Sequence, residues 1–255
     1  MTQVTSIDLS AFQPEPDLLR DRVILITGAG SGIGAATAEA CAASGATVIL
    51  LGRTQEKLEQ VDDRIRARIK DAEPVLMPFD LESREHESYH QIATAIEQQF
   101  GRLDGLVHSG AVLGQRTPIE QYNHAAWERV FQINVHGGFH LTRALLPLMK
   151  RGPQGRIVFL SSSVGRQGRA YWGAYAASKF AVEGLSETLA DELKSQADFC
   201  VNVVNPGRTR TAMRVSAYPA EDPATVPTPE SHVPLMLYLL SHHCSGQTGQ
   251  SFDAQ

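Results

Sequence analysis

The sequence predicts an α/β fold in which one mostly parallel, seven-stranded sheet forms the middle layer of a three-layer sandwich. Short aliphatic and β-branched runs alternate with longer stretches of helical character from residue 23 onward. The connections between successive runs are long enough for helical crossovers, which parallel strands require. This regular alternation and the length of 255 residues favour a single domain over residues 1–255.

The elements follow one another in a regular order. A polar lead-in with two prolines is expected at residues 1–20. Strands are expected at 23–27, 47–51, 74–79, 104–108, 156–161, 199–205 and 250–254. Helices are expected at 33–44, 55–70, 84–100, 125–150, 174–196 and 231–241. The proline-containing stretch 206–231 is expected to be an irregular loop.

A glycine-rich turn connects the first strand to the first helix. The strand at 23–27 is short and aliphatic, as buried parallel strands are, and the alanine-rich stretch 35–43 favours a helix. Four glycines stand between them, in the spacing Gly-x-x-x-Gly-x-Gly from Gly28 to Gly34 with Gly30 inside it. Such a turn presents backbone N–H groups and a helix N-terminus to a ligand, which suits a pyrophosphate. A plain glycine-rich turn is the alternative.

The end of the second strand bears on which nucleotide is bound. An acidic residue there would bind the 2′-hydroxyl of the adenosine ribose and repel a 2′-phosphate. Leu51, Gly52 and Arg53 include no acid. Because a guanidinium forms charge-assisted hydrogen bonds with phosphate, NADP(H) is expected in preference to NAD(H). A solvated surface arginine is the alternative.

A tyrosine and a lysine form a candidate acid–base pair. Tyr175 and Lys179 are four residues apart in a predicted helix, so their side chains share one face. A free phenol has a pKa of about 10, and a nearby ammonium lowers that pKa toward neutrality. Ser162 lies upstream of the tyrosine, after the predicted strand at 156–161. The pair alone is common on helices, and it gains weight from the glycine turn in the same chain.

Together these features resemble the short-chain dehydrogenase/reductase family over almost the whole chain. The matching segments are Thr27-Gly28-Ala29-Gly30-Ser31-Gly32-Ile33-Gly34, Asp80-Leu81, Ile133-Asn134-Val135, Ser162, Tyr175 with Lys179, and the stretches 205–211 and 248–253. The stretch 161–179 is also similar to an uncharacterised bacterial oxidoreductase subgroup. The resemblance implies a Rossmann-type fold and a dinucleotide cofactor.

The resemblance also implies which residues form the site. The catalytic residues would be Asn134, Ser162, Tyr175 and Lys179. The cofactor-binding residues would be Thr27, Gly28, Ser31, Gly32, Ile33, Gly34, Arg53, Asp80, Leu81, Ser109, Gly110, Tyr175, Lys179, Pro206, Gly207, Thr209 and Thr211. No metal is implied.

By resemblance, the reaction is hydride transfer between NADP(H) and a carbonyl or secondary alcohol. Tyr175 would give its proton to the developing alkoxide in reduction and take it back in oxidation, while Ser162 would donate a hydrogen bond to the same oxygen. Lys179 would lower the pKa of the phenol and bind the nicotinamide ribose. Asn134 would hold a water near Lys179, or would only satisfy backbone groups at a helix kink. Two other classes stay open: a non-catalytic NADP(H)-binding redox regulator, and an epimerase or dehydratase that uses the nucleotide transiently.

One segment departs from the family pattern. The family has Asn-Asn-Ala-Gly after the fourth strand, and this chain has His108-Ser109-Gly110-Ala111. A neutral imidazole donates one hydrogen bond and accepts one, so His108 can replace an amide in a structural role. A new catalytic histidine is the alternative.

The substrate is not identified by the sequence. The expected pocket walls are residues 112–117, 165–172 and 212–230, which contain aromatic and cationic side chains. The relevant residues are Tyr171, Trp172, Met213, Tyr218, Arg166, Arg169 and Arg214. They would suit a hydrophobic carbonyl compound with an acidic group, or they serve only packing and surface charge.

Composition narrows the partners and the location. The net charge of -5 and the lack of a basic stripe argue against nucleic acid. Three widely spaced cysteines have no metal-ligand pattern and indicate a reducing compartment. Because neither a signal peptide nor an apolar membrane span is evident, a cytoplasmic location is expected. By resemblance, the helices at 125–150 and 174–196 would form the interface of a homodimer or homotetramer.

Overall fold

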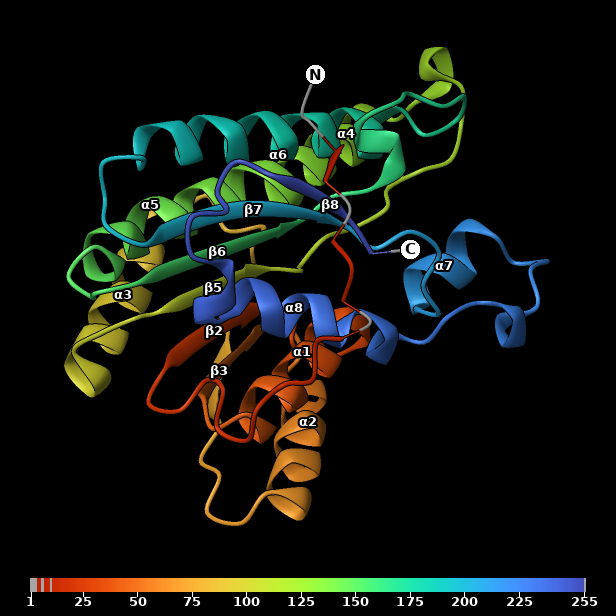
Figure 1. The fold of residues 1–255 in the computed structure, drawn as a ribbon. Coiled ribbons are helices and arrows are strands. Elements are labelled where there is room, and N and C mark those ends of the chain that lie inside the picture. Colours follow the sequence, from red (N-terminus) through yellow and green to blue (C-terminus); the bar gives the residue numbers. More distant parts are fainter. Residues whose placement is uncertain (1–3, 6, 10, 255) are drawn as a thin grey trace.

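Eight parallel strands form one sheet in the computed structural model, which describes residues 4–5, 7–9 and 11–254 (Figure 1). The strand order is β1-β8-β7-β6-β5-β2-β3-β4, and each neighbouring pair is parallel. The strands are β1 Val4–Thr5, β2 Val23–Thr27, β3 Thr47–Gly52, β4 Val75–Pro78, β5 Gly105–His108, β6 Gly155–Leu160, β7 Phe199–Asn205 and β8 Ser251–Asp253. The predicted Rossmann-type α/β fold is confirmed.

The predicted number of seven strands is wrong by one. The additional strand, β1, lies within the stretch predicted as a polar lead-in, and it pairs with β8 through Val4 opposite Ser251. A two-residue segment is too short to show the period of a strand, and its pairing depends on a partner at the other end of the chain. Residues 1–3, 6 and 10 of this lead-in, and residue 255 of the predicted domain, lie outside the described residues.

Helices cover both faces of the sheet. They are α1 Gly32–Ala43, α2 Gln55–Arg68, α3 His86–Phe100, α4 His124–Phe131, α5 Gly138–Met149, α6 Gly173–Glu192, α7 Ala212–Ala217 and α8 Val233–Leu240. Ile24 and Ile26 of β2 pack into the core with α1, α2 and α8, whereas Leu25 between them packs with α3, α5 and α6. This alternation follows the two-residue period of a strand and gives the predicted three layers. Among the described helices, none combines the length and apolar character needed to cross a bilayer.

The predicted long helix at 125–150 is interrupted in its middle. Between α4 and α5 the chain forms a π-helical segment, Gln132–Gly137. At Gly137 an added Cβ would lie 2.6 Å from the carbonyl oxygen of Leu81, so the helix passes very close to the loop after β4. Such widened turns are frequent at functional sites. The interruption places Asn134 beside the carboxyl end of β5.

The strand order creates a crevice at the carboxyl ends of β2 and β5. β2 pairs with β3 on one side and with β5 on the other. The chain therefore adds β3 and β4 on one side of β2 and then crosses to the opposite side for β5. In open α/β sheets, ligands bind at this type of switch point. The predicted irregular loop at 206–231 lies after β7 and contains the short helix α7 together with two single turns of 3₁₀ helix.

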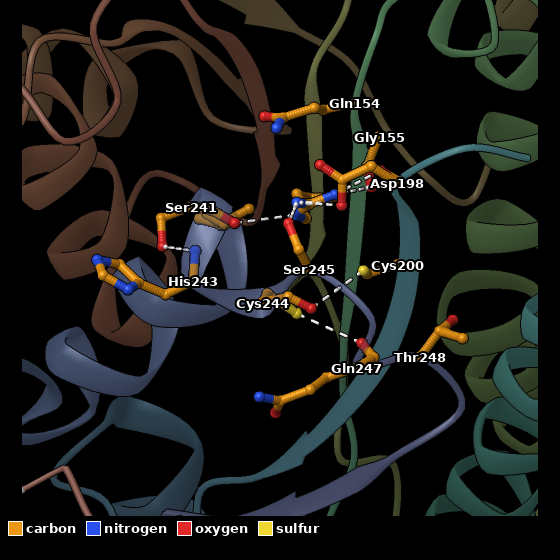
Figure 2. Close-up of polar contacts among 12 residues, drawn as sticks. Gln154, Gly155, Asp198, Cys200, Ser241, His243, Cys244, Ser245, Gln247 and Thr248 are labelled. Carbon is orange, nitrogen blue, oxygen red and sulfur yellow. Dashed lines mark hydrogen bonds and ion pairs between the residues drawn. The ribbon is translucent and has the colours of Figure 1, made fainter.

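Buried polar contacts join the amino-terminal ends of β6 and β7 to the C-terminal part of the chain. Figure 2 shows Asp198, Ser241 and Ser245, which contribute to them. The side chain of Arg156 is fully buried and donates hydrogen bonds to the Asp198 carboxylate at 2.8 Å, the Ser241 carbonyl at 2.9 Å and the Ser245 hydroxyl at 3.1 Å. Nearby, the Cys200 thiol donates to the carbonyl oxygen of Cys244. These contacts lie at the end of the sheet opposite the crevice.

Candidate active site

A cavity of about 530 Å³ opens at the carboxyl ends of the strands. Its walls come from the glycine turn and from the segments that follow β3, β4, β5, β6 and β7. The lining includes these predicted site residues: Gly28, Ser31, Gly32, Ile33, Arg53, Asp80, Leu81, Ser109, Gly110, Ser162, Tyr175, Lys179, Pro206, Gly207, Thr209 and Thr211. Residues that are far apart in the sequence therefore share one site.

Two predicted cofactor-binding residues lie behind the cavity wall. The fully buried Thr27 accepts hydrogen bonds on its hydroxyl from the backbone N–H groups of Ser109 and Gly110, at 3.0 and 2.9 Å. At Gly34 an added Cβ would lie 2.5 Å from the carbonyl oxygen of Gly28. Both residues thus shape the turn rather than face its ligand.

Asn134 also lies behind the wall, in the π-helical segment. Its Oδ1 accepts a hydrogen bond from the backbone N–H of Val112 at 2.8 Å, and its Nδ2 donates to the Val112 carbonyl and the Ser178 hydroxyl, each at 3.0 Å. Both amide hydrogens are therefore used, and only an acceptor position on Oδ1 remains for a water. These contacts match the alternative in which Asn134 satisfies backbone groups.

The glycine turn has the shape that a pyrophosphate requires. Gly28 has a φ of +65°, and an added Cβ there would lie 2.8 Å from the Cα of Gly110. Gly32 has a φ of +55° and begins α1, whose first backbone N–H groups have no partner within the helix. Side chains at these positions would strain the backbone and would fill the space next to the helix N-terminus. The turn therefore fits the phosphates of a dinucleotide.

Two cations lie beside the glycine turn, where an added Cβ at Gly30 would lie 2.9 Å from the Cβ of Lys57. Arg53 follows β3, and Lys57 lies in the first turn of α2; both are exposed and both line the cavity. Among the described residues, neither forms an ion pair with a carboxylate. They are therefore available to an anionic group at this end of a bound ligand.

Tyr175 and Lys179 are buried side by side at the floor of the cavity, on one face of α6. Ser162 lines the cavity with Tyr175 and acts on its hydroxyl, and the Lys179 ammonium lies 5.6 Å from the centre of the Tyr175 ring. Lys179 also donates a hydrogen bond to the carbonyl oxygen of Leu160 at 2.7 Å. The predicted Ser/Tyr/Lys arrangement is thus assembled around the end of β6.

Burial changes the proton affinities of both groups. It raises the pKa of Tyr175 to about 12, and the side chain of Ser162 opposes this rise. It also lowers the pKa of Lys179 to about 8, while the charge of Glu183 acts in the opposite direction. In the protein alone, desolvation of the phenolate is the largest influence on the pKa of Tyr175. The positive charge of an oxidised nicotinamide would act to lower that pKa.

His108 occupies a closed, apolar position. Its ring stacks on Phe159 with centroids 4.5 Å apart, and its Nε2 lies 2.8 Å from the hydroxyl of Thr142. Because that hydroxyl donates its own hydrogen to the Gly138 carbonyl, Nε2 is the donor in the contact with His108. Burial lowers the pKa of His108 to about 3, so the ring is neutral at ordinary pH. These contacts favour a structural role.

Comparisons with known proteins agree with this geometry. Residues 22–222 match the model of the short chain dehydrogenase family. The chain is a member of the short-chain dehydrogenase family. It is 49% identical, over 96% of both chains, to an uncharacterized oxidoreductase of Escherichia coli named YciK.

Solved structures are similar over nearly the whole of this short-chain dehydrogenase. A protein from Pseudomonas syringae assigned to the same family is 48% identical, with a TM-score of 0.94 over 98% of this chain and 100% of that one. A protein from Shigella flexneri, solved in complex with NADP, is 49% identical, with a TM-score of 0.92 over 94% of this chain and 100% of that one. A third, from Escherichia coli in complex with NADPH, is 48% identical, with a TM-score of 0.92 over 95% of this chain and 100% of that one.

The side of the cavity next to Tyr175 is mainly apolar in this dehydrogenase. Trp172 and Ala217 are buried there with Tyr175, and Leu113 and Met213 pack against them. The guanidinium of Arg116 lies 4.9 Å from the centre of the Trp172 ring and donates to the carbonyl oxygen of Ala217. The loop after β5 therefore contacts the end of α7 across Trp172.

The arginines that were expected near the substrate are already engaged. Arg214 forms two hydrogen bonds with the Glu221 carboxylate, at 2.6 and 2.7 Å. Arg166 contacts Glu183 and Asp253 beneath the cavity, and Arg169 donates to the Tyr218 hydroxyl at 2.9 Å. These contacts favour the alternative in which the arginines serve packing and surface charge.

Two residues that sequence reasoning missed are part of the site. Lys57 lines the cavity beside Arg53, and its place in the first turn of the predicted helix at 55–70 is the signal that could have identified it. Glu183 is buried one helical turn after Lys179. A carboxylate four residues after Lys179 is visible in the sequence, whereas its burial is not.

Proposed function

We propose that the chain is an NADP(H)-dependent oxidoreductase that interconverts a carbonyl compound and a secondary alcohol. The observation that carries this proposal is the buried Tyr175–Lys179 pair, which shares with Ser162 the cavity that begins at the glycine turn. The NADP and NADPH complexes of similar proteins support the choice of cofactor.

The protein's own residues supply proton transfer and orientation. The nicotinamide, when bound, supplies or accepts the hydride. In reduction, Tyr175 gives its hydroxyl proton to the carbonyl oxygen, and Ser162 donates a second hydrogen bond to that oxygen as negative charge develops on it. The charge of Lys179 favours the phenolate that remains, and its contact with the Leu160 carbonyl fixes the ammonium near the ring. In the alcohol-oxidising direction Tyr175 acts as the base.

Arg53 and Lys57 account for a preference for NADP(H) over NAD(H). Both cations line the adenosine end of the cavity, and neither is paired with a carboxylate among the described residues. A 2′-phosphate would gain charge-assisted hydrogen bonds there, whereas a 2′-hydroxyl would not gain as much.

The substrate that fits best is an uncharged, mostly apolar carbonyl compound. Leu113, Trp172 and Met213 form the walls next to Tyr175, and the nearest lining arginine, Arg214, is neutralised by Glu221. A carboxylate on the substrate would lose hydration in this chamber, and Arg214 is already paired with Glu221.

Assembly as a homodimer or homotetramer is part of the proposal. Phe139 of α5 and Phe180 of α6 are 42% and 46% exposed, and Leu146 and Leu185 line a shallow surface hollow between the same helices. Leu141 and Leu145 point into the core instead, so they do not contribute to an interface. Light scattering on the purified protein, with Phe139→Asp as the disrupting variant, tests this association.

The experiment that tests the function is a panel of carbonyl compounds with NADPH and of alcohols with NADP. Net oxidation of NADPH with at least one carbonyl compound, at a stoichiometry of one cofactor per carbonyl, is the expected result. Tight NADPH binding without oxidation across a broad panel would favour a redox regulator. Conversion of a substrate without net change in the cofactor would favour an epimerase or dehydratase.

A further inference from the structure

A second group of charged side chains lies beneath the proposed catalytic residues. Arg166 donates hydrogen bonds to the Asp253 carboxylate and the Ser251 hydroxyl, each at 2.6 Å, and to Glu183 at 3.3 Å. Ser251 in turn donates to the second oxygen of Glu183 at 3.0 Å. The Glu183 side chain is only 6% exposed, so the group is largely shielded from water.

Three of the segments that carry proposed catalytic or cofactor-binding groups contribute to this cluster. Arg166 follows Ser162 by four residues, and Glu183 follows Lys179 by one helical turn. Asp253 also accepts a hydrogen bond from Asn205 at 2.8 Å, directly before Pro206. The Ser162 loop, α6 and the loop after β7 are therefore held together by one set of contacts.

The packing around this cluster is close. At Gly165, next to Arg166, an added Cβ would lie 2.7 Å from the Cβ of Lys179 and 2.7 Å from the hydroxyl of Ser161. A small movement of Arg166 would therefore be transmitted to the backbone beside Lys179. Because proton transfer tolerates little misplacement, such a movement would affect turnover.

The electrostatic environment of Lys179 depends on four neighbouring groups, of which Glu183 belongs to the cluster. Tyr175 and Glu183 share its helix, neutral His108 approaches from β5, and neutral Asn134 approaches from the π-helical segment. Glu183 is the anion among these groups, and its charge favours the protonated lysine against burial, which disfavours it. Glu183 lies beyond ion-pair distance of Lys179, and its carboxylate forms an ion pair with Arg166.

We propose that Arg166 and Glu183 are positioning residues for the reaction: together they hold the Ser162 loop against α6, and Glu183 places a buried negative charge one helical turn from the Lys179 ammonium. This inference rests on the proposed function, because it assumes that protonated Lys179 supports turnover and nicotinamide-ribose binding. The two residues are expected to act in opposite directions on Lys179. Removing Glu183 takes away a favourable charge, whereas removing Arg166 leaves the charge of Glu183 less compensated.

The test compares pH profiles of three variants with those of the wild type. Glu183→Gln keeps the shape of the side chain, and Arg166 can still pair with Asp253, so the fold is expected to persist. Arg166→Gln removes the opposing charge, and Ser251→Ala is the control, because it removes a hydrogen bond of the cluster without changing its charge. Turnover with the best substrate of the panel and NADPH affinity, from its fluorescence, are both measured against pH, and thermal unfolding reports on folding.

Opposite shifts are the expected result. The alkaline limit of turnover and of NADPH affinity should move down by roughly one pH unit in Glu183→Gln and up in Arg166→Gln, and should stay in place in Ser251→Ala. Folded Glu183→Gln and Arg166→Gln variants with an unchanged alkaline limit in both measurements would overturn the inference, as would shifts in the same direction. Failure of the wild type to oxidise NADPH with any carbonyl compound would instead count against the proposed function, while the NADPH affinity profiles would still test Glu183.

Discussion

The Lys179 ammonium donates a hydrogen bond to the carbonyl oxygen of Leu160, the last residue of β6. The contact ties the amine to the backbone just before Ser162, so the ring of Tyr175, the amine and the serine are placed by one strand end and one helix face. A buried ammonium destabilises the fold, so Lys179 occupies this site although it lowers the free energy of unfolding.

Replacing Lys179 by methionine should stabilise the protein and abolish turnover. The pKa of Lys179 is lowered to about 8 in the folded protein, below its ordinary value of 10.5. Its destabilising effect is therefore fully present below pH 8 and disappears as the pH rises toward 10.5. At pH 7, Lys179→Met should raise the free energy of unfolding by roughly 1–3 kcal/mol. Urea unfolding at pH 7 and pH 10 checks this expectation, and a variant that is less stable at pH 7 would contradict it.

Replacing Tyr175 by phenylalanine should remove the proton donor and leave NADPH binding intact. General acid catalysis by a positioned side chain contributes about 10²–10⁴-fold, so kcat should fall by that factor. NADPH affinity, measured by fluorescence, should change by less than about threefold, because the lost hydroxyl contacts the substrate rather than the phosphates. Tyr171→Phe is the matched control, since that tyrosine is exposed nearby and should be dispensable. Near-normal turnover of Tyr175→Phe would exclude the assigned role.

Replacing Arg53 by glutamine should weaken NADPH binding selectively. Hydrogen bonds to charged groups contribute about 1.5–3 kcal/mol, so KM for NADPH should rise by roughly ten- to a hundredfold, while KM for NADH should hardly change. Lys57→Gln should have a smaller effect in the same direction. Arg84→Gln serves as the control, because that exposed arginine is paired with Glu128 and does not line the cavity. Equal losses for NADPH and NADH would show that Arg53 does not select the nucleotide.

Replacing His108 by asparagine should preserve turnover and change the acid stability of the protein. The pKa of His108 is lowered to about 3 from its ordinary value of 6.5. Above pH 6.5 the ring of His108 is neutral in both the folded and the unfolded protein. Between pH 6.5 and about 3, the unfolded chain binds a proton that the folded protein does not. The wild type should therefore lose stability across this window, and His108→Asn should lose less. Unfolding curves at pH 7, 5 and 4 measure this difference, and a kcat reduced by more than about tenfold would point to a catalytic histidine instead.

Sequence alone predicted the parts of the fold that depend on local pattern. The run at 23–27 has the aliphatic composition of a buried strand, and the structure has β2 at Val23–Thr27. The fixed spacing of Ser162, Tyr175 and Lys179 was enough to bring all three to one cavity, because strand ends and helix faces determine their positions.

Features that depend on contacts between distant segments were not predictable in this way. β1 pairs with a strand at the other end of the chain, and the π-helical interruption around Asn134 reflects packing against the loops after β4 and β5. The pKa of Tyr175 depends on burial, which no spacing of residues reports. For the same reason, the sequence did not predict the contact between Arg166 and Glu183, which belongs to a cluster that also includes Ser251 of the last strand.

The contacts of Arg156, which stabilise the fold, lie at the opposite end of the sheet from the proposed catalytic residues. Its contacts with Asp198, Ser241 and Ser245 lie across the full length of the sheet from Tyr175. Substitutions that raise stability can therefore be sought around Arg156 while specificity is altered around Trp172 and Met213. The two sets of changes should combine additively, because no side-chain contact joins the two regions within the described part of the chain.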